Sequence, residues 1–236
     1  MTRRFLFGDE SGNFDFRSHL QHQGASRYFS VGTVTIDGED AVHDLVVDLN
    51  RLRFRLLQNG VKLGDFFHAS EDTEAVRHAV LEVLATHDFR VDVTILEKSK
   101  ALPRIRTSDP QFFKYAWFYH FKYISGQLFV PGHELTVVSA VLGGTRKMKA
   151  AMRQSVEDVV AQCCHWDVPR TFGFWPTATD PCLQAADYAL WAVMRDFERD
   201  DSVWRDHISD KVKSSYDLWK VGKVHYYGPE AATLTA

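Results

Sequence analysis

The chain has 236 residues, of which 45% are hydrophobic and 25% charged, so it can bury a large core and is not expected to be disordered. Its net charge of −3 argues against tight non-specific binding of nucleic acid, although acidic metal ligands would offset basic contacts in this sum. No stretch approaches the roughly 20 apolar residues of a membrane helix. Three cysteines, two of them adjacent, cannot form a disulfide framework, which is typical of a reducing cytoplasm. We therefore expect a cytoplasmic protein, and the lack of a long apolar stretch predicts that it has no membrane contact.

Apolar periodicity and turn residues predict alternating strands and helices along the chain. In chain order these elements are strand 4–9, strand 28–36, helix 40–57, short strand 64–69, a helix capped by Ser70 or Asp72 and reaching Leu84, strand 89–96, helix 109–128, strand 134–142, helix 145–163 and helix 180–199. The tail from Asp201 is expected to begin as helix. The helix 109–128 is apolar nearly all round, which indicates burial in the core or in a homodimer interface.

This order of elements predicts an α/β fold in which early strands pair as an antiparallel meander within a mixed sheet, with helices on both faces. It suits an RNase H-like core. A Rossmann-like sheet fits less well, because no helix follows the first strand and no G-x-G-x-x-G turn is present. We expect one domain over 1–200 with a helical insertion near 40–57, and a C-terminal extension over 201–236.

Three acidic residues lie where the apolar pattern predicts burial. Asp9 continues the face of Phe5 and Phe7, Asp187 lies in the apolar stripe of the last helix, and Glu97 ends a strand in phase with its apolar row. Because an uncompensated buried carboxylate costs several kcal/mol, each needs a hydrogen bond, a partner or a metal ion. A fourth acid, Glu71, begins a helix beside His68.

Each acid also has a structural interpretation. Asp9 could accept backbone hydrogen bonds in a turn, and Asp187 could bind a tyrosine or an arginine. Glu71 is the kind of acid that favours the first turn of a helix, and Glu97 could face solvent at a strand end. The functional hypothesis therefore depends on joint placement, because an RNase H-like sheet brings the first strand, the following helix start and the last helix to one edge.

A cluster of carboxylates is stable at neutral pH only with a cation or with protons on some members. Mg²⁺ or Mn²⁺ supplies that charge through oxygen ligands. Two such ions about 4 Å apart promote in-line displacement at a phosphodiester without a covalent nucleophile.

Three runs of residues resemble the bacterial family catalogued as domain of unknown function 3800. They are Phe7-Gly8-Asp9-Glu10-Ser11-Gly12, Phe67-His68-Ala69-Ser70-Glu71 and Leu183-Gln184-Ala185-Ala186-Asp187-Tyr188, and the resemblance spans roughly 4–199. It implies an RNase H-like fold and a role linked to mobile elements or phage defence. By this resemblance Asp9, Glu71 and Asp187 are the catalytic metal ligands, and Glu10, which points to the opposite strand face, has an outer role.

The chain departs from the family pattern at one position. Many members carry an acid near the end of the late strand, where this chain has Ser139. The leading hypothesis is a Mg²⁺- or Mn²⁺-dependent nuclease or phosphodiesterase that binds DNA or RNA transiently. Asp9, Glu71 and Asp187 would hold the metal, Glu97 is a fourth candidate, and His68 would orient a ligand or move a proton. The alternative is an inactive RNase H-like module that binds nucleic acid or a protein partner.

Overall fold

The computed structural model describes residues 2–20, 22, 24–128, 132–141 and 143–227. Within them lies one mixed sheet with the strand order β5-β4-β1-β2-β3-β6. The elements are β1 (Thr2–Ser11), β2 (Tyr28–Asp37), α1 (Glu39–Gln58), α2 (Glu74–Thr86), β3 (Arg90–Glu97), η1 (Lys98–Lys100), η2 (Pro103–Ile105), α3 (Asp109–Leu128), β4 (His133–Ala140), α4 (Arg146–Cys163), β5 (Arg170–Trp175), η3 (Thr177–Thr179), α5 (Pro181–Arg199), α6 (Val203–Asp206) and β6 (Val212–Asp217).

The strand pairings confirm the predicted N-terminal meander. β1 pairs with β2 and β2 with β3, both antiparallel. β4 lies parallel to β1 on its other side, β5 lies parallel to β4, and β6 lies parallel to β3. The order β5-β4-β1-β2-β3, with an antiparallel meander and two parallel strands beside β1, is the predicted RNase H-like core with one strand added at its edge.

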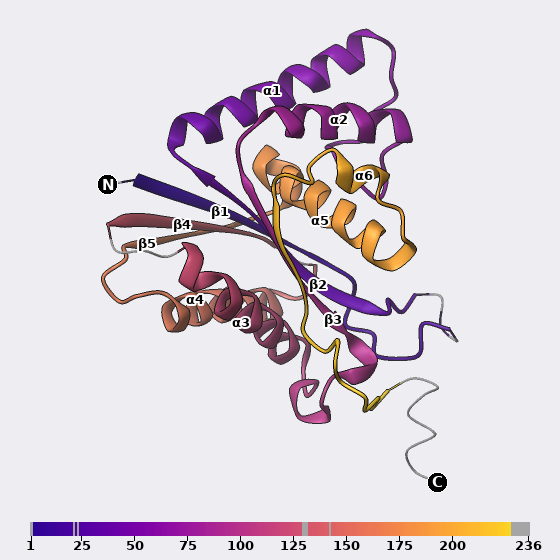
Figure 1. Cartoon of the computed structure of the whole chain (residues 1–236), viewed down its shortest axis with the longest axis vertical. Coiled ribbons are helices and arrows are strands. Elements are labelled where there is room, and N and C mark those ends of the chain that lie inside the picture. The colour runs from indigo at the N-terminus through magenta and orange to yellow at the C-terminus, as the bar shows by residue number, and fades with distance from the viewer. Residues whose placement is uncertain (1, 21, 23, 129–131, 142, 228–236) are drawn as a thin grey trace.

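Helices cover both faces of the sheet, as Figure 1 shows. The helices α1, α2, α5 and α6 lie on one face, where Phe7 belongs to the core, and α3 and α4 lie on the other, where Leu6 is buried. Successive β1 side chains therefore enter two separate apolar layers, as expected for a central strand. This alternation decides which face each acid at the end of β1 reaches.

The predicted short strand over 64–69 is wrong, because this segment forms an irregular loop between α1 and α2. Three successive backbone amides in the loop donate to side chains instead of to a neighbouring strand. The acceptors are Gln184 Oε1 for Phe67, Asp72 Oδ2 for His68 and Asp187 Oδ2 for Ala69. The following helix is capped by Thr73, whose side chain accepts from the amide of Val76, and not by Ser70 or Asp72.

Two strands at the sheet edges were not predicted. β5 is short and its apolar alternation is limited to Phe172 and Phe174 on either side of Gly173, whereas β6 consists mostly of polar residues. The expected helix at the start of the tail covers only Val203–Asp206. β4 runs over His133–Ala140, and the strand end predicted at Leu142 lies outside the described residues. In the part of the chain that the structure describes, no helix is both long and apolar enough to cross a membrane.

Candidate active site

Asp9 and Glu10 lie near the end of β1 and point to opposite faces of the sheet, as their alternation predicts. Asp9 lies on the α5 side with only 8% of its surface exposed, and Glu10 lies on the α3 side, where Trp117 Nε1 donates to Glu10 Oε1 over 2.7 Å. Trp117 reaches this carboxylate by packing over Gly8, where an added Cβ would lie 2.3 Å from the indole ring. Glu10 is therefore bound within the α3 layer, away from the side that holds Asp9.

A glycine in the neighbouring strand allows α5 to approach Asp9. Gly32 is the register partner of Asp9 in β2, and a Cβ built on Gly32 would lie 2.9 Å from Leu190 Cβ. Leu190 follows Asp187 by three residues, so the two side chains share one face of α5. The lack of a side chain at Gly32 thus lets the helix press its Asp187 face against the end of β1.

Asp187 and His68 form the polar centre of the site. Asp187 Oδ2 accepts a hydrogen bond from the backbone amide of Ala69 at 2.8 Å, and it lies 3.2 Å from Nδ1 of His68. The other ring nitrogen of His68, Nε2, lies 3.4 Å from Ser70 Oγ. The last helix therefore holds the 67–72 loop through the residue expected to be a metal ligand.

Two further residues of α5 hold the same loop. Tyr188 donates its hydroxyl proton to Asp72 Oδ2, which also accepts from the amide of His68, and Gln184 Oε1 accepts from the amide of Phe67. Sequence reasoning missed these roles. The signal was the spacing i, i+3, i+4 of Gln184, Asp187 and Tyr188, which places three polar side chains on one helix face that is otherwise apolar.

The electrostatics of the site follow from burial. Desolvation, and then the charge of Asp187, raise the pKa of Asp9 to about 8. The hydrogen bond to Asp187 raises the pKa of His68 in spite of partial burial. Burial also raises the pKa of Glu10 well above its ordinary value, and Glu10 Oε2 is buried without a hydrogen-bond partner among the described residues. The ionised form of Asp9 is thus disfavoured relative to the protonated form unless a positive charge lies beside it.

The carboxylate oxygens of Asp9 and Asp187 fit part of the ligand set of a hard divalent cation. The backbone amide of Glu10 binds Asp9 Oδ1, and the loop binds Asp187 Oδ2, so Asp9 Oδ2 and Asp187 Oδ1 accept no hydrogen bond from the described part of the chain. Mg²⁺ is commonly held by one or two carboxylates while it keeps several waters. These two oxygens are the atoms of this chain that would hold such an ion.

The predicted third ligand does not join this pair. The side chain of Glu71 is 78% exposed, and its Oε1 lies 4.0 Å from Nε2 of His68. Over the described ranges, no group of three or more His, Cys, Asp or Glu side chains is arranged to hold a metal ion. The prediction that Glu71 begins a helix is wrong, because α2 begins at Glu74 and Glu71 lies in the exposed turn before it. The structure brings together Asp9, Asp187 and His68, with Glu71 at the rim.

The fourth candidate, Glu97, is a partner of basic residues. It forms ion pairs with Arg27 at 3.0 Å and with Lys100 at 2.9 Å, which compensate its burial. Asp9 pairs with Gly32 of β2, and Gly32 pairs with Val93 of β3, so Asp9 and Val93 lie at the same height along the sheet. Glu97 is four residues further along that strand, or about 13 Å at 3.3 Å per residue. It is therefore not a ligand beside Asp9.

β4 carries Ser139 at the position where many members of the resembled family have an acid. Ser139 of β4 is the register partner of Gly8 in β1, one residue before Asp9. Its side chain is 1% exposed, and Ser139 Oγ donates to the carbonyl of Ala140. Ser139 is therefore part of the buried structure and brings no charge to the site.

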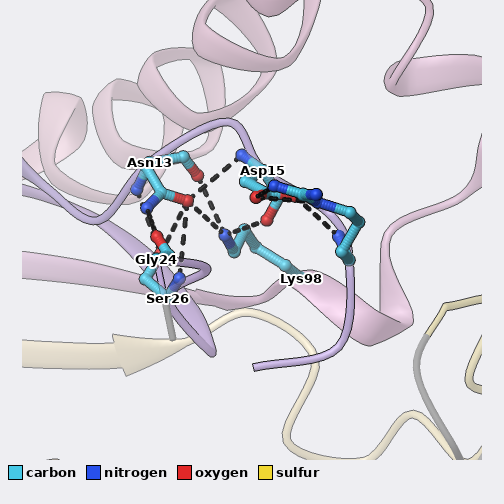
Figure 2. Close-up of polar contacts among 6 residues, drawn as sticks. Asn13, Asp15, Gly24, Ser26 and Lys98 are labelled. Atoms are coloured by element: carbon cyan, nitrogen blue, oxygen red, sulfur yellow. Dashed lines mark hydrogen bonds and ion pairs between the residues drawn. The ribbon is translucent and has the colours of Figure 1, made fainter. Parts of the chain in front are cut away.

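A buried lysine fixes the loop that follows β1, as shown in Figure 2. Lys98 Nζ donates to Asn13 O and Asn13 Oδ1, each at 3.0 Å, and to Asp15 O at 2.6 Å. Burial lowers the pKa of Lys98 to about 8. Asn13 Oδ1 also accepts from the amide of Asp15, so one amide side chain organises the turn after Asp9-Glu10-Ser11-Gly12. This network connects the loop after β1 to the end of β3, which Lys98 follows directly in the chain.

Fold and site together define an RNase H-like α/β protein with a pair of carboxylates beside a histidine. No protein-family model matches the chain, and no curated protein matches it with statistical significance. Among solved structures it is similar to the ribonuclease H2 from Pyrococcus horikoshii OT3, at a TM-score of 0.44 and 10% identity, over 86% of this chain and 74% of that one. The fold assignment itself rests on the strand order and pairing of this chain.

Proposed function

We propose that this protein is a divalent-metal-dependent nuclease or phosphodiesterase, and that it belongs to the family its motifs resemble. The observation that carries the proposal is the approach of Asp187 on α5 to Asp9 on β1 across Gly32. Each carboxylate keeps one oxygen without a hydrogen bond from the described residues. Buried acids in this arrangement need a cation, and Mg²⁺ or Mn²⁺ matches oxygen donors.

The chain's own groups would orient the reaction. Asp9 and Asp187 would hold the ion, which on binding supplies the positive charge that phosphodiester displacement requires. His68 would fix the Asp187 carboxylate through Nδ1, and the amide of Ala69 fixes the same oxygen from the backbone. Such partners of a ligand keep its free oxygen in one direction. Glu71 would then act from the rim, outside the direct ligand set.

Cleavage of labelled DNA and RNA oligonucleotides, with Mn²⁺ or Mg²⁺ and with EDTA, tests the proposal. The wild-type protein should cut at least one of them only with the metal. Asp187→Asn should abolish cutting, since an amide cannot supply the negative charge, whereas Glu71→Gln should retain most of it. Asp196→Asn, on the same helix but paired with Arg205, is the matched control and should cut normally.

One observation favours the second function, an inactive module that binds nucleic acid or a protein. Asp187 already holds the 67–72 loop, which is a structural role in itself, and Glu71 is exposed. If no metal promotes cleavage and Mn²⁺ causes no thermal shift, the nuclease proposal is wrong and this alternative replaces it. If Asp187→Asn unfolds the protein, Asp9→Asn serves as the second variant, because it leaves the loop contacts intact.

A further inference from the structure

A groove beside the candidate active site is not used by the proposed metal chemistry. It has a volume of about 400 Å³ and lies between α1, the 65–67 segment and the start of α5. Its size falls within the range of small-molecule and nucleotide pockets. The polar and aromatic side chains of its lining are Asn50, Arg53, Asp65, Phe66, Phe67, Thr179 and Gln184.

The groove shares a wall with the site. Phe66 lines it and also stacks on the ring of His68, with ring centroids 5.6 Å apart and planes inclined by 15°. Gln184 lines it too, and this residue holds the amide of Phe67 from α5, one turn before Asp187. A molecule in the groove would therefore lie one aromatic ring away from the histidine that contacts Asp187.

The chemistry of the walls favours an uncharged planar group over a second phosphate. Phe66 is half-buried and offers a ring, and Asn50 offers an amide at the exposed rim. Arg53 Nη2 is anchored to the carbonyls of Gly64 and Asp65, which holds the guanidinium at the groove. The carboxylate of Asp65 is also in the lining, and it would repel a phosphate. Aromatic stacking with polar groups at the edge is how proteins hold unpaired bases.

We propose that this groove binds an unpaired nucleobase of the strand whose phosphate lies at Asp9 and Asp187. The base stacks on Phe66, and Asn50 and Arg53 contact its edge. This inference rests on the proposed nuclease function and adds the substrate class, a single strand or an unpaired region. A base within a duplex cannot enter, because its face is covered by its stacked neighbours.

The experiment measures binding without cleavage. Fluorescence anisotropy follows a labelled mixed-sequence single strand in EDTA, beside the same sequence as a duplex. The single strand should bind more tightly. Phe66→Ala should weaken single-strand binding roughly 5- to 150-fold, which is the range that corresponds to about 1–3 kcal/mol of stacking on one side chain. Phe54→Ala is the matched control, because Phe54 is a 66% exposed phenylalanine of α1 outside the groove lining.

Two further variants separate stacking from indirect effects. Phe66→Trp should restore binding, and its fluorescence should be quenched when the oligonucleotide is added. Arg77→Met should leave EDTA binding within about twofold of wild type, because it removes the hydrogen bond from α2 to the carbonyl of Ala69 in the same loop but no residue of the groove lining. Equal weakening by Arg77→Met and Phe66→Ala would show that Phe66 acts only through the active-site loop, and would overturn the groove inference.

Failure of the groove inference differs from failure of the nuclease proposal. If wild type cuts with Mn²⁺ but Phe66→Ala binds and cuts normally, the groove inference is wrong and the nuclease proposal stands. If wild type binds single strands through Phe66 but never cuts, the groove inference stands and the inactive module is the correct function. Equal affinity for duplex and single strand also contradicts the groove inference.

Discussion

Asp9 and Asp187 show at the residue scale how burial prepares a site for a cation. Asp9 is 8% exposed, and the structure gives it one backbone hydrogen bond, from the amide of Glu10. Desolvation is the main cause of its raised pKa, and the charge of Asp187 adds to it. Burial of such an acid lowers the free energy of unfolding, and a bound cation would remove this penalty. The same two residues therefore provide both a functional test and a thermodynamic one.

We expect Asp9→Asn to change the pH dependence of folding stability. With a pKa raised from 3.8 to about 8, native Asp9 holds a proton that the unfolded chain releases between these values. Stability from this residue is thus greatest below pH 4 and is lost as the pH rises toward 8. At about 1.4 kcal/mol per pKa unit the effect is of the order of several kcal/mol. Urea unfolding at pH 5 and pH 8.5 should show the loss in wild type and a flatter profile in Asp9→Asn; parallel profiles would contradict the assignment.

We expect Asp187→Asn to lower the pKa of His68. The hydrogen bond that His68 donates to Asp187 is the largest cause of the raised pKa, so without the carboxylate the pKa of His68 should return toward the ordinary 6.5. Imidazole proton shifts in an NMR titration measure it directly. Glu71→Gln should move the His68 pKa much less, since Glu71 Oε1 is 4.0 Å from Nε2 and largely exposed. A larger shift from Glu71→Gln would mean that the rim acid, not Asp187, controls the histidine.

At the scale of elements, α5 connects the sheet to the loop that completes the site. Its Gln184, Asp187 and Tyr188 bind the 67–72 loop, and its Leu190 packs on Gly32 of β2. From α2, Arg77 Nε also donates to the carbonyl of Ala69. The loop has no strand pairing of its own, so its conformation depends on these side chains. Displacement of α5 should therefore disturb the site and the fold together.

We expect Gly32→Ala to push α5 away from β1. The new Cβ would lie 2.9 Å from Leu190 Cβ, so the helix must shift, at about 1–3 kcal/mol for an overpacked contact. Metal-dependent cleavage should fall with it. Leu190→Ala added to Gly32→Ala should recover part of the activity. The control is Gly126→Ala in α3, where an added Cβ meets nothing within 4 Å and helix propensity gains up to about 1 kcal/mol. Normal activity in Gly32→Ala would show that the close approach is not required.

We expect Lys98→Met to loosen the loop after β1. Its ammonium satisfies three acceptors of Asn13 and Asp15, and unpaired buried acceptors cost about 1–3 kcal/mol. Amide hydrogen exchange over 13–16 should accelerate, while the exposed control Lys62→Met leaves it unchanged. Because the Lys98 pKa is lowered to about 8, wild-type stability from this group rises between pH 8 and 10.5, and the variant should lose that rise. Unchanged amide exchange over 13–16 in Lys98→Met would show that Lys98 does not stabilise the loop after β1.

At the scale of the whole molecule, the tail belongs to the main sheet. β6 extends the sheet beside β3, where Ser214 Oγ donates to the buried Asp92. Trp204 and Ile208 are buried in the layer that contains α5, and Trp219 packs against the layer that contains α3. Residues expected to form an extension therefore contribute to both apolar layers.

We expect deletion of 201–236 to destabilise the whole fold. Each large apolar side chain removed from a core costs about 1.5–3 kcal/mol, and Trp204, Ile208 and Trp219 would all be lost. Thermal unfolding by circular dichroism should show a much lower midpoint or no cooperative transition. Ser214→Ala, which removes only the hydrogen bond to Asp92, should cost about 1 kcal/mol. A truncated protein of wild-type stability would mark the tail as a separate appendage.

The sequence predicted most of the central elements but little of the periphery. β1, β2 and β3 carry strong apolar patterns, and an antiparallel meander of the early strands was predicted from the order of elements, although its third strand is β3 and not the short strand expected at 64–69. The 64–69 segment has a strand-like composition, yet its amides bind side chains of α5 and Asp72. β6 is polar, so only its position beside β3 makes it a strand. Local pattern cannot detect elements that distant partners create.

The opposite directions of Asp9 and Glu10 were determined by the sequence alone, because side chains alternate along any strand. The α/β class, the mixed sheet and the placement of Asp187 on the inner face of the last helix followed from periodicity. Only the tertiary structure decided which acids meet. Gly32 lets α5 reach Asp9, Glu71 turns to solvent, and Glu97 is neutralised by Arg27 and Lys100. Convergence depends on contacts between residues far apart in the chain, and a linear pattern holds no information on those distances.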